Sequence, residues 1–208
     1  MYASIAAFVI MLILGISYKK ADFKKDKGTP TPKTTLLKGA TTCVAGGLAL
    51  YSAFTGGGTY AATISVALFL CAVADMLLEH HFMAGMGVFA LGHVVYIAAF
   101  IIKNGFNEVS LLAFAGLLIL LLLLYNHAEK LTDKNILPYA LYGVVIMFML
   151  SQAFFAGYLT ALGALLFVAS DSLIAWRIVK GNGDNQNEIA CISLYYTAQF
   201  LFALSTIY

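Results

Sequence analysis

The chain has 208 residues, of which 62% are hydrophobic and 11% are charged. Ordinary soluble domains carry roughly 25% charged residues, so this composition excludes a soluble globular class and indicates a membrane protein. The net charge of +2 is too small to indicate a nucleic-acid partner, and we expect none.

Apolar segments of membrane-spanning length recur along the whole chain. A helix needs about 20 mostly apolar residues to cross a bilayer. Helices are expected because an open strand in lipid leaves its backbone groups unpaired. We predict an all-α, polytopic membrane protein, a single transmembrane helical domain over residues 1–208. Its eight spans are expected at Tyr2–Tyr18, Thr34–Phe54, Thr59–Leu78, Met83–Ile102, Val109–Tyr125, Ile136–Phe155, Gly157–Trp176 and Ile189–Ile207.

The connections between these spans are short, and the odd-numbered ones carry most of the positive charge. The first, over residues 19–33, contains six lysines, and the odd connections together hold ten of the twelve Lys and Arg residues. Positively charged loops remain in the cytoplasm. We therefore predict Lys-rich loops in the cytoplasm, where they meet anionic lipid headgroups, and both termini on the outer side of the cell membrane.

Two aspartates interrupt the long apolar segments. Asp75 lies in SVALFLCAVADMLL and Asp171 lies in ALGALLFVASDSLIAW, whereas the other eight acidic residues lie in connections or at the ends of spans. A carboxylate in hydrocarbon costs roughly 2.5–3.5 kcal/mol, so such residues usually face a protein interior and serve a function. Two of them in one small protein indicate a shared site.

Further polar residues fall at the depth of these aspartates. With a rise of 1.5 Å per residue, they lie within about 6–20 Å of the predicted cytoplasmic boundary. Spacings of three and four residues place two pairs of them each on one helix face. The candidate site therefore includes, beside the two aspartates, Lys38, His93, Tyr96, Tyr195 and Gln199.

Structural interpretations of these residues remain open beside the functional one. Lys38 could extend to the lipid headgroups, and His93 could form a hydrogen bond between helices. Tyrosines are common near membrane interfaces, so Tyr195 could simply pack there. Since His93 is the only histidine at membrane depth, we expect neither a metal ion nor another cofactor.

The segments around the two aspartates resemble each other. ALFLCAVADMLL and ALLFVASDSLIA share an apolar run, a small residue, the aspartate and further apolar residues, and the aspartates are 96 positions apart. Such a repeat could record a duplicated four-helix unit. In that case the bundle would consist of two four-helix halves, with the two acids facing each other across a pseudo-axis.

Several short motifs occur in a fixed order from about Thr34 to the end of the chain. They are Lys38-Gly-Ala-Thr-Thr42, Ala74-Asp-Met-Leu-Leu78, Phe89-Ala-Leu-Gly-His-Val-Val-Tyr96, Gly163-Ala-Leu-Leu-Phe-Val-Ala-Ser-Asp-Ser172 and Tyr195-Tyr-Thr-Ala-Gln199. Together they resemble the YhhN family of lysoplasmalogenase-like integral membrane proteins. The sequence departs from that family at Gly39, where proline is frequent, and at Ala74, where glycine is common.

The resemblance implies a multi-span hydrolase that cleaves the vinyl-ether bond of lysoplasmalogens, giving a fatty aldehyde and a glycerophospho-base. Vinyl-ether hydrolysis starts with protonation of the β-carbon and passes through an oxocarbenium ion, which water captures. Two carboxyl groups in one pocket of low dielectric do not ionise equally, so one can donate the proton while the other stabilises the cation. Glycosidases divide the work of two carboxyl groups in the same way.

We therefore expect Asp75 and Asp171 to be the catalytic pair, with either residue as the acid. Lys38 could hold the ionised aspartate or the phosphate of the lysophospholipid substrate. The remaining candidates would orient carboxyl groups, water and glycerol hydroxyls; these are His93, Tyr96, Tyr195 and Gln199.

Three other classes compete with this hypothesis. An intramembrane aspartyl protease also uses two aspartates on spans, but the usual GxGD sequence precedes neither Asp75 nor Asp171. A proton-coupled transporter could use the same aspartates as proton carriers. A purely structural membrane protein would leave the shared depth of the polar residues unexplained.

Overall fold

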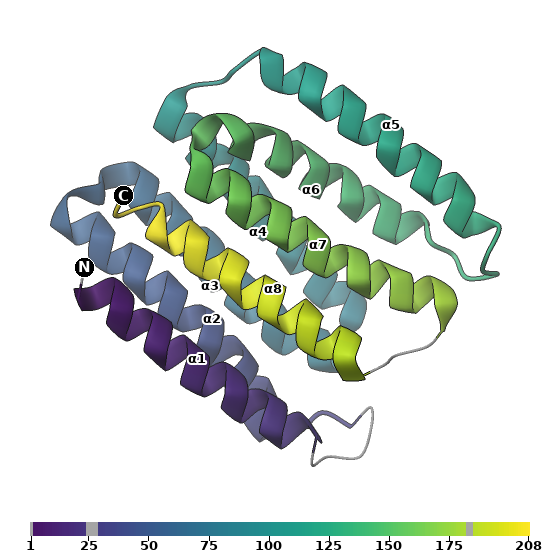
Figure 1. The fold of residues 1–208 in the computed structure, drawn as a ribbon, viewed down its shortest axis with the longest axis horizontal. Coiled ribbons are helices and arrows are strands. Elements are labelled where there is room, and N and C mark those ends of the chain that lie inside the picture. Colours follow the sequence, from purple (N-terminus) through teal and green to yellow (C-terminus); the bar gives the residue numbers. More distant parts are fainter. Residues whose placement is uncertain (1, 24–28, 182–184) are drawn as a thin grey trace.

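The computed structural model describes residues 2–23, 29–181 and 185–208, and these residues fold almost entirely into helices (Figure 1). This confirms the predicted all-α class and the number of main helices. Lys24, Lys25 and Lys27 of the predicted Lys-rich connection lie outside the described residues. The elements are α1 (Tyr2–Phe23), α2 (Pro32–Ser52), η1 (Ala53–Gly57), α3 (Gly58–His80), α4 (Phe82–Asn104), α5 (Val109–Glu129), α6 (Leu137–Ala156), α7 (Tyr158–Lys180) and α8 (Asn185–Leu204).

Six helical stretches of the described chain are long and apolar enough to cross a membrane. One of these, Pro32–His80, is 49 residues long and contains both α2 and α3, which pack against each other after a turn. Helix α8 is not among the six, since it starts with the polar sequence NQNE and carries polar side chains along its length. It nevertheless packs between α2 and α7 as part of the bundle.

Glycines allow the reversals between α2 and α3 and between α6 and α7. In η1 a π-helical turn ends the straight path of α2, and Gly56 and Gly58 have φ values of 119° and 58°. Gly157, between α6 and α7, has a φ of 141°. Residues with a Cβ rarely adopt such values, which explains glycine at both turns.

Six helices form a closed ring in which each packs against the next, in the order α2, α3, α4, α6, α7 and α8, with α8 returning to α2. Helix α1 packs outside this ring on α2 and α8, and α5 packs outside it on α6 (Figure 1). The contacts among α5–α8 repeat those among α1–α4, which agrees with the expectation of two four-helix halves. Both ends of the chain lie at the same end of the bundle (Figure 1).

The start of α2 is fixed by local sequence and by a contact with α3. Thr31 and Thr34 form a reciprocal capping box, with both backbone-to-side-chain distances at 3.2 Å, and Pro32 occupies the first turn. The hydroxyl of Thr34 also donates to Glu79 Oε2 of α3 at 3.0 Å, and Tyr18 of α1 donates to Glu79 Oε1 at 3.2 Å. Glu79 therefore joins three helices and sets the register of α2 against α3.

Candidate functional site

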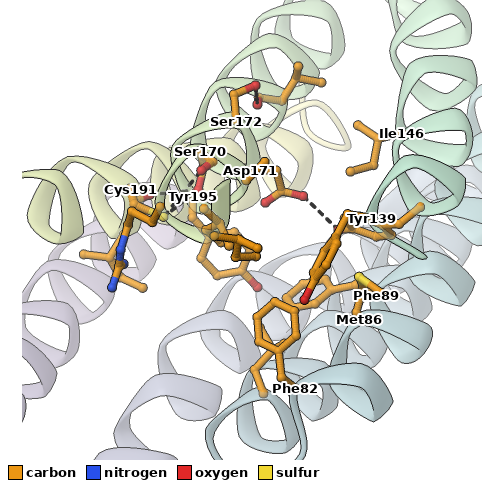
Figure 2. Close-up of a pocket in the computed structure, with 18 of the residues that line it drawn as sticks. Phe82, Met86, Phe89, Tyr139, Ile146, Ser170, Asp171, Ser172, Cys191 and Tyr195 are labelled. Atoms are coloured by element: carbon orange, nitrogen blue, oxygen red, sulfur yellow. Dashed lines mark hydrogen bonds between the residues drawn. The ribbon is translucent and has the colours of Figure 1, made fainter. Parts of the chain in front are cut away.

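A cavity of about 700 Å³ lies at the end of the bundle where α1, α3 and α7 end, and both predicted aspartates line it. Asp75 belongs to α3 and Asp171 to α7, which occupy opposite positions in the ring of six helices. Figure 2 shows Asp171 and Tyr195 projecting into this space, with Phe82 and Phe89 of α4 on its wall. The two acidic side chains thus face one shared interior.

Asp75 is almost fully enclosed, with 2% of its surface exposed. Its Oδ2 accepts two hydrogen bonds, from Thr42 Oγ1 of α2 at 2.6 Å and from the Tyr195 hydroxyl of α8 at 2.7 Å. Lys38, one helical turn before Thr42, lines the same cavity and lies within electrostatic range of the Asp75 carboxyl. Two helices, α2 and α8, therefore supply groups that stabilise negative charge on Asp75.

Asp171 is half-buried, and its Oδ2 accepts one hydrogen bond, from the Tyr142 hydroxyl of α6 at 2.8 Å. The neighbouring Ser170 donates to the Cys191 carbonyl of α8 at 3.0 Å, which holds α7 against α8 at this level. Tyr142 also lines the cavity, although it was not among the predicted site residues. It lies five residues after the start of α6, at the depth of the predicted site residues.

The other predicted residues lie behind the cavity wall. His93 is buried, and its ring packs edge-on against Phe167 and Tyr142, with ring centroids 4.6 and 5.6 Å away. The Tyr96 hydroxyl donates to Gln199 Oε1 at 2.7 Å, and both side chains are fully buried. The structure therefore brings Lys38, Tyr195 and the two aspartates to the cavity. It places His93, Tyr96 and Gln199 in the layer of side chains behind the cavity wall.

Charged residues of both signs surround the mouth of the cavity. Lys19 Nζ of α1 lies 3.5 Å from Glu188 Oε2 of α8, and Arg177 of α7 lies 2.7 Å from Glu188 Oε1. Lys19 also pairs with Asp22 at 2.9 Å, and Lys134 Nζ donates to the Ile178 carbonyl at 2.9 Å. These rim residues were not among the predicted site residues, because they lie in connections or at the ends of helices.

Apolar side chains line the remaining wall, so the cavity changes in polarity along its length. Phe82, Met86, Phe89 and Ile146 are among them (Figure 2). A charged mouth, a pair of carboxyl groups and an apolar interior match a ligand with a polar headgroup and a hydrocarbon chain. The fold and the site define a polytopic helical membrane protein with a cavity lined by two carboxyl groups and by apolar side chains.

The chain belongs to the YhhN family, whose sequence model matches residues 33–206. It is 33% identical to a Homo sapiens protein named Lysoplasmalogenase TMEM86B. The alignment spans 172 residues, which cover 79% of this chain and 71% of the human protein. The proteins of the same name from Rattus norvegicus and Sus scrofa are each 31% identical, over 73% and 72% of this chain and 64% and 65% of their own lengths. No solved structure matches the chain.

Proposed function

We propose that this membrane protein hydrolyses the vinyl-ether bond of lysoplasmalogens, releasing a fatty aldehyde and a glycerophospho-base. The observation that carries the proposal is the convergence of Asp75 and Asp171, from opposite helices of the ring, on one amphipathic cavity. The relatives named lysoplasmalogenase support the substrate class, since they align with most of the chain. The two carboxyl groups supply the acid and the charge that the reaction needs.

The hydrogen bonds favour different roles for the two aspartates. Asp75 Oδ2 accepts two hydroxyl donors and has Lys38 nearby, and such contacts favour the ionised form of a carboxyl group. Asp171 Oδ2 accepts one donor, Tyr142, which is compatible with a neutral acid that carries its proton on the other oxygen. We therefore assign Asp171 as the proton donor and Asp75 as the carboxylate that stabilises the cation.

In the first step, the acidic proton of Asp171 moves to the β-carbon of the vinyl ether, and the π electrons of the double bond form the new C–H bond. The resulting oxocarbenium ion is stabilised by the negative charge of Asp75. Water then adds to the cationic carbon and loses a proton to the Asp171 carboxylate. The hemiacetal finally collapses: Asp171 donates its proton to the glycerol oxygen as the C–O bond breaks, and the hemiacetal hydroxyl returns its proton to Asp171 as the aldehyde C=O bond forms. The acid is thus regenerated, and the net reaction consumes one water.

The charged rim provides complementary partners for a zwitterionic headgroup. Lys19 and Arg177 could contact the phosphate, while Asp22 or Glu188 could contact the amine of the base. Lys38 lies deeper than this rim and could serve either the phosphate or Asp75. A headgroup held at the rim directs the ether-linked carbons toward the aspartates.

The multi-pass architecture also suggests a membrane orientation. The cavity mouth lies at the end of the bundle that carries Lys19, Lys134 and Arg177. The positive-inside tendency assigns this end to the cytoplasm and both termini to the outer side. A Lys20→Cys variant in sealed cells should then react with a thiol reagent only after the membrane has been permeabilised, and labelling of intact cells would reverse the orientation.

The direct test uses the purified protein in detergent with three lysophospholipids that share headgroup and chain length. The alkenyl lipid should yield fatty aldehyde, whereas the acyl and saturated alkyl lipids should not. In D₂O the aldehyde should carry one deuterium on the carbon next to the carbonyl, because that carbon receives the proton in the first step. Cleavage of a helical peptide, or substrate flux driven by a pH gradient without aldehyde, would contradict the proposal.

A further inference from the structure

The cavity reaches the outer surface of the bundle on one side. Its lining includes Ser172 and Ala175, which are exposed residues of α7, together with Gly143 of α6 and Leu121 of α5. Helices α5 and α7 both pack against α6. The cavity therefore extends sideways across α6, between α5 and α7, in addition to opening at the charged rim.

Below the aspartates the cavity is shallow. Along α7 its lining runs from Ile178 near the mouth to Val168, which precedes Asp171 by three residues, about 4.5 Å of helix. The floor is closed by packed rings, since Phe89 and Phe167 each meet Tyr195 edge-on with centroids 5.9 and 5.5 Å away. A long hydrocarbon chain that starts at the aspartates must therefore leave sideways.

Gly143 of α6 lines the part of the cavity that extends between α5 and α7. A Cβ added there would lie 3.0 Å from Leu121 Cδ1 of α5, so the Leu121 side chain already packs over Gly143, and a larger side chain at Gly143 would have to displace it into the cavity between α5 and α6. Ser110, at the far end of α5, is the one buried residue of that helix and accepts a hydrogen bond from Gln152 Nε2 of α6 at 2.6 Å. Helix α5 is thus held to α6 at the end far from the site, and its side chains near the site are only partly buried or exposed.

We propose that the hydrocarbon chain of the substrate leaves the buried site across Gly143, between α5 and α7, and continues into the bilayer. This inference rests on the proposed function and adds the path of the lipid chain and the residue that controls it. The headgroup remains at the charged rim, the vinyl ether lies at the aspartates, and Gly143 sets how long a chain the enzyme accepts. The substrate enters from the membrane through the same opening.

The test compares Gly143→Leu with Gly116→Leu, a matched control on α5 at which an added Cβ meets nothing within 4 Å. Each variant is assayed with alkenyl lysophosphoethanolamines of short and long chain, and kcat/KM is taken from aldehyde release. Gly143→Leu should lower kcat/KM for the long chain by roughly tenfold or more, with little change for the short chain that ends inside the cavity. Gly116→Leu should leave both values unchanged.

A second measurement does not depend on turnover. A saturated alkyl lysophospholipid with a photoreactive diazirine at mid-chain should label peptides of α5, α6 and α7 that flank Gly143, and Gly143→Leu should reduce this labelling. The path would be overturned if Gly143→Leu lowered kcat/KM equally for short and long chains or for neither. Labelling confined to α2 and α3 would also overturn it. Absence of aldehyde from every alkenyl lipid with the wild-type protein would instead overturn the proposed hydrolysis.

Discussion

The two aspartates occupy corresponding helices of the two halves of the bundle, α3 and α7, but their surroundings differ. Around Asp75, α2 and α8 each contribute a hydroxyl donor, and little of its surface is exposed. Around Asp171, the residues that the structure describes contribute one side-chain donor, Tyr142 of α6, and the Asp171 side chain remains half-buried beside the open wall of the cavity. Repeated helical positions can thus hold two carboxyl groups in unequal environments.

This inequality is what acid catalysis with two carboxyl groups requires. Two equivalent aspartates would compete for one proton, whereas unequal sets of donors direct the proton to one of them. Because Thr42 and Tyr142 come from corresponding helices, α2 and α6, the difference arises from side-chain identity and from the additional contact of Tyr195. Substitutions at the two sites should therefore have unequal effects on turnover.

The largest effect is expected from removing either carboxyl group. Asp75→Asn and Asp171→Asn should each lower kcat for aldehyde release by about 10²–10⁴-fold, since each loses one part of the acid and carboxylate pair. Glu129→Gln, at the exposed end of α5, is the matched acid-to-amide control and should retain full activity. Near-normal turnover in both aspartate variants, with size-exclusion profiles like that of the wild type, would remove the catalytic pair.

An intermediate effect is expected from the tyrosine donors, and it should be unequal. Within the described part of the chain, Tyr142 is the one side-chain donor to Asp171, and Tyr142→Phe removes it, whereas Tyr195→Phe leaves the Thr42 hydrogen bond to Asp75 in place. We expect kcat to fall by roughly tenfold or more in Tyr142→Phe and by less in Tyr195→Phe, because a lost hydrogen bond to a charged or acidic group costs about 1.5–3 kcal/mol.

Tyr60→Phe is the control for these tyrosine variants, because Tyr60 pairs with Ser205 at 2.6 Å and does not line the cavity. Its kcat should match that of the wild type. A larger loss in Tyr195→Phe than in Tyr142→Phe would reverse the assignment of the two aspartates.

The smallest effect is expected at the charged rim. Arg177→Gln should raise KM for a zwitterionic lysolipid a few-fold with little change in kcat, since exposed ion pairs contribute about 0.2–1 kcal/mol. Lys180→Gln, on the same helix but outside the cavity lining, should leave KM unchanged. A fall in kcat without a change in KM would indicate that Arg177 acts on the reaction step.

Much of the fold could be predicted from the sequence because lipid restricts the choices. Each predicted span overlaps one observed helix, from α1 at Tyr2–Phe23 to α8 at Asn185–Leu204. The hydrocarbon core fixes the length of a span and requires helical hydrogen bonding, so apolar length locates α1 to α7, whereas α8 is more polar. The ring order of the helices could not be predicted, because apolar segments carry no signal for which neighbour they pack against.

The sequence predicted the depth of the site residues in the membrane, but not the direction in which each side chain points. Position along a helix gives the height of a residue in the membrane, and on this basis His93 and Gln199 were grouped with Asp75. The side toward which a residue points depends on how its helix is rotated in the bundle, and apolar faces on all sides leave that rotation undetermined. The structure resolves it by placing His93 and Gln199 behind the cavity wall.

Tyr142 shows the converse case, a residue at the predicted depth that was not selected. Tyrosines near the ends of spans are common at membrane interfaces, so its position gave no reason to separate it from an anchoring role. Only the contact with Asp171 distinguishes it. Lys19, Arg177 and Glu188 were missed because charged residues in connections usually meet water, and here they surround the cavity mouth.

The most direct test of the unequal pair is infrared difference spectroscopy of the protonated carboxyl band at neutral pH. With Asp171 as the acid, the wild-type protein and Asp75→Asn should both show the C=O band of a protonated carboxyl group, and Asp171→Asn should lack it. A band that persists in Asp171→Asn and disappears in Asp75→Asn would contradict the assignment. A carboxyl band that persists in both variants would contradict a proton held by the pair.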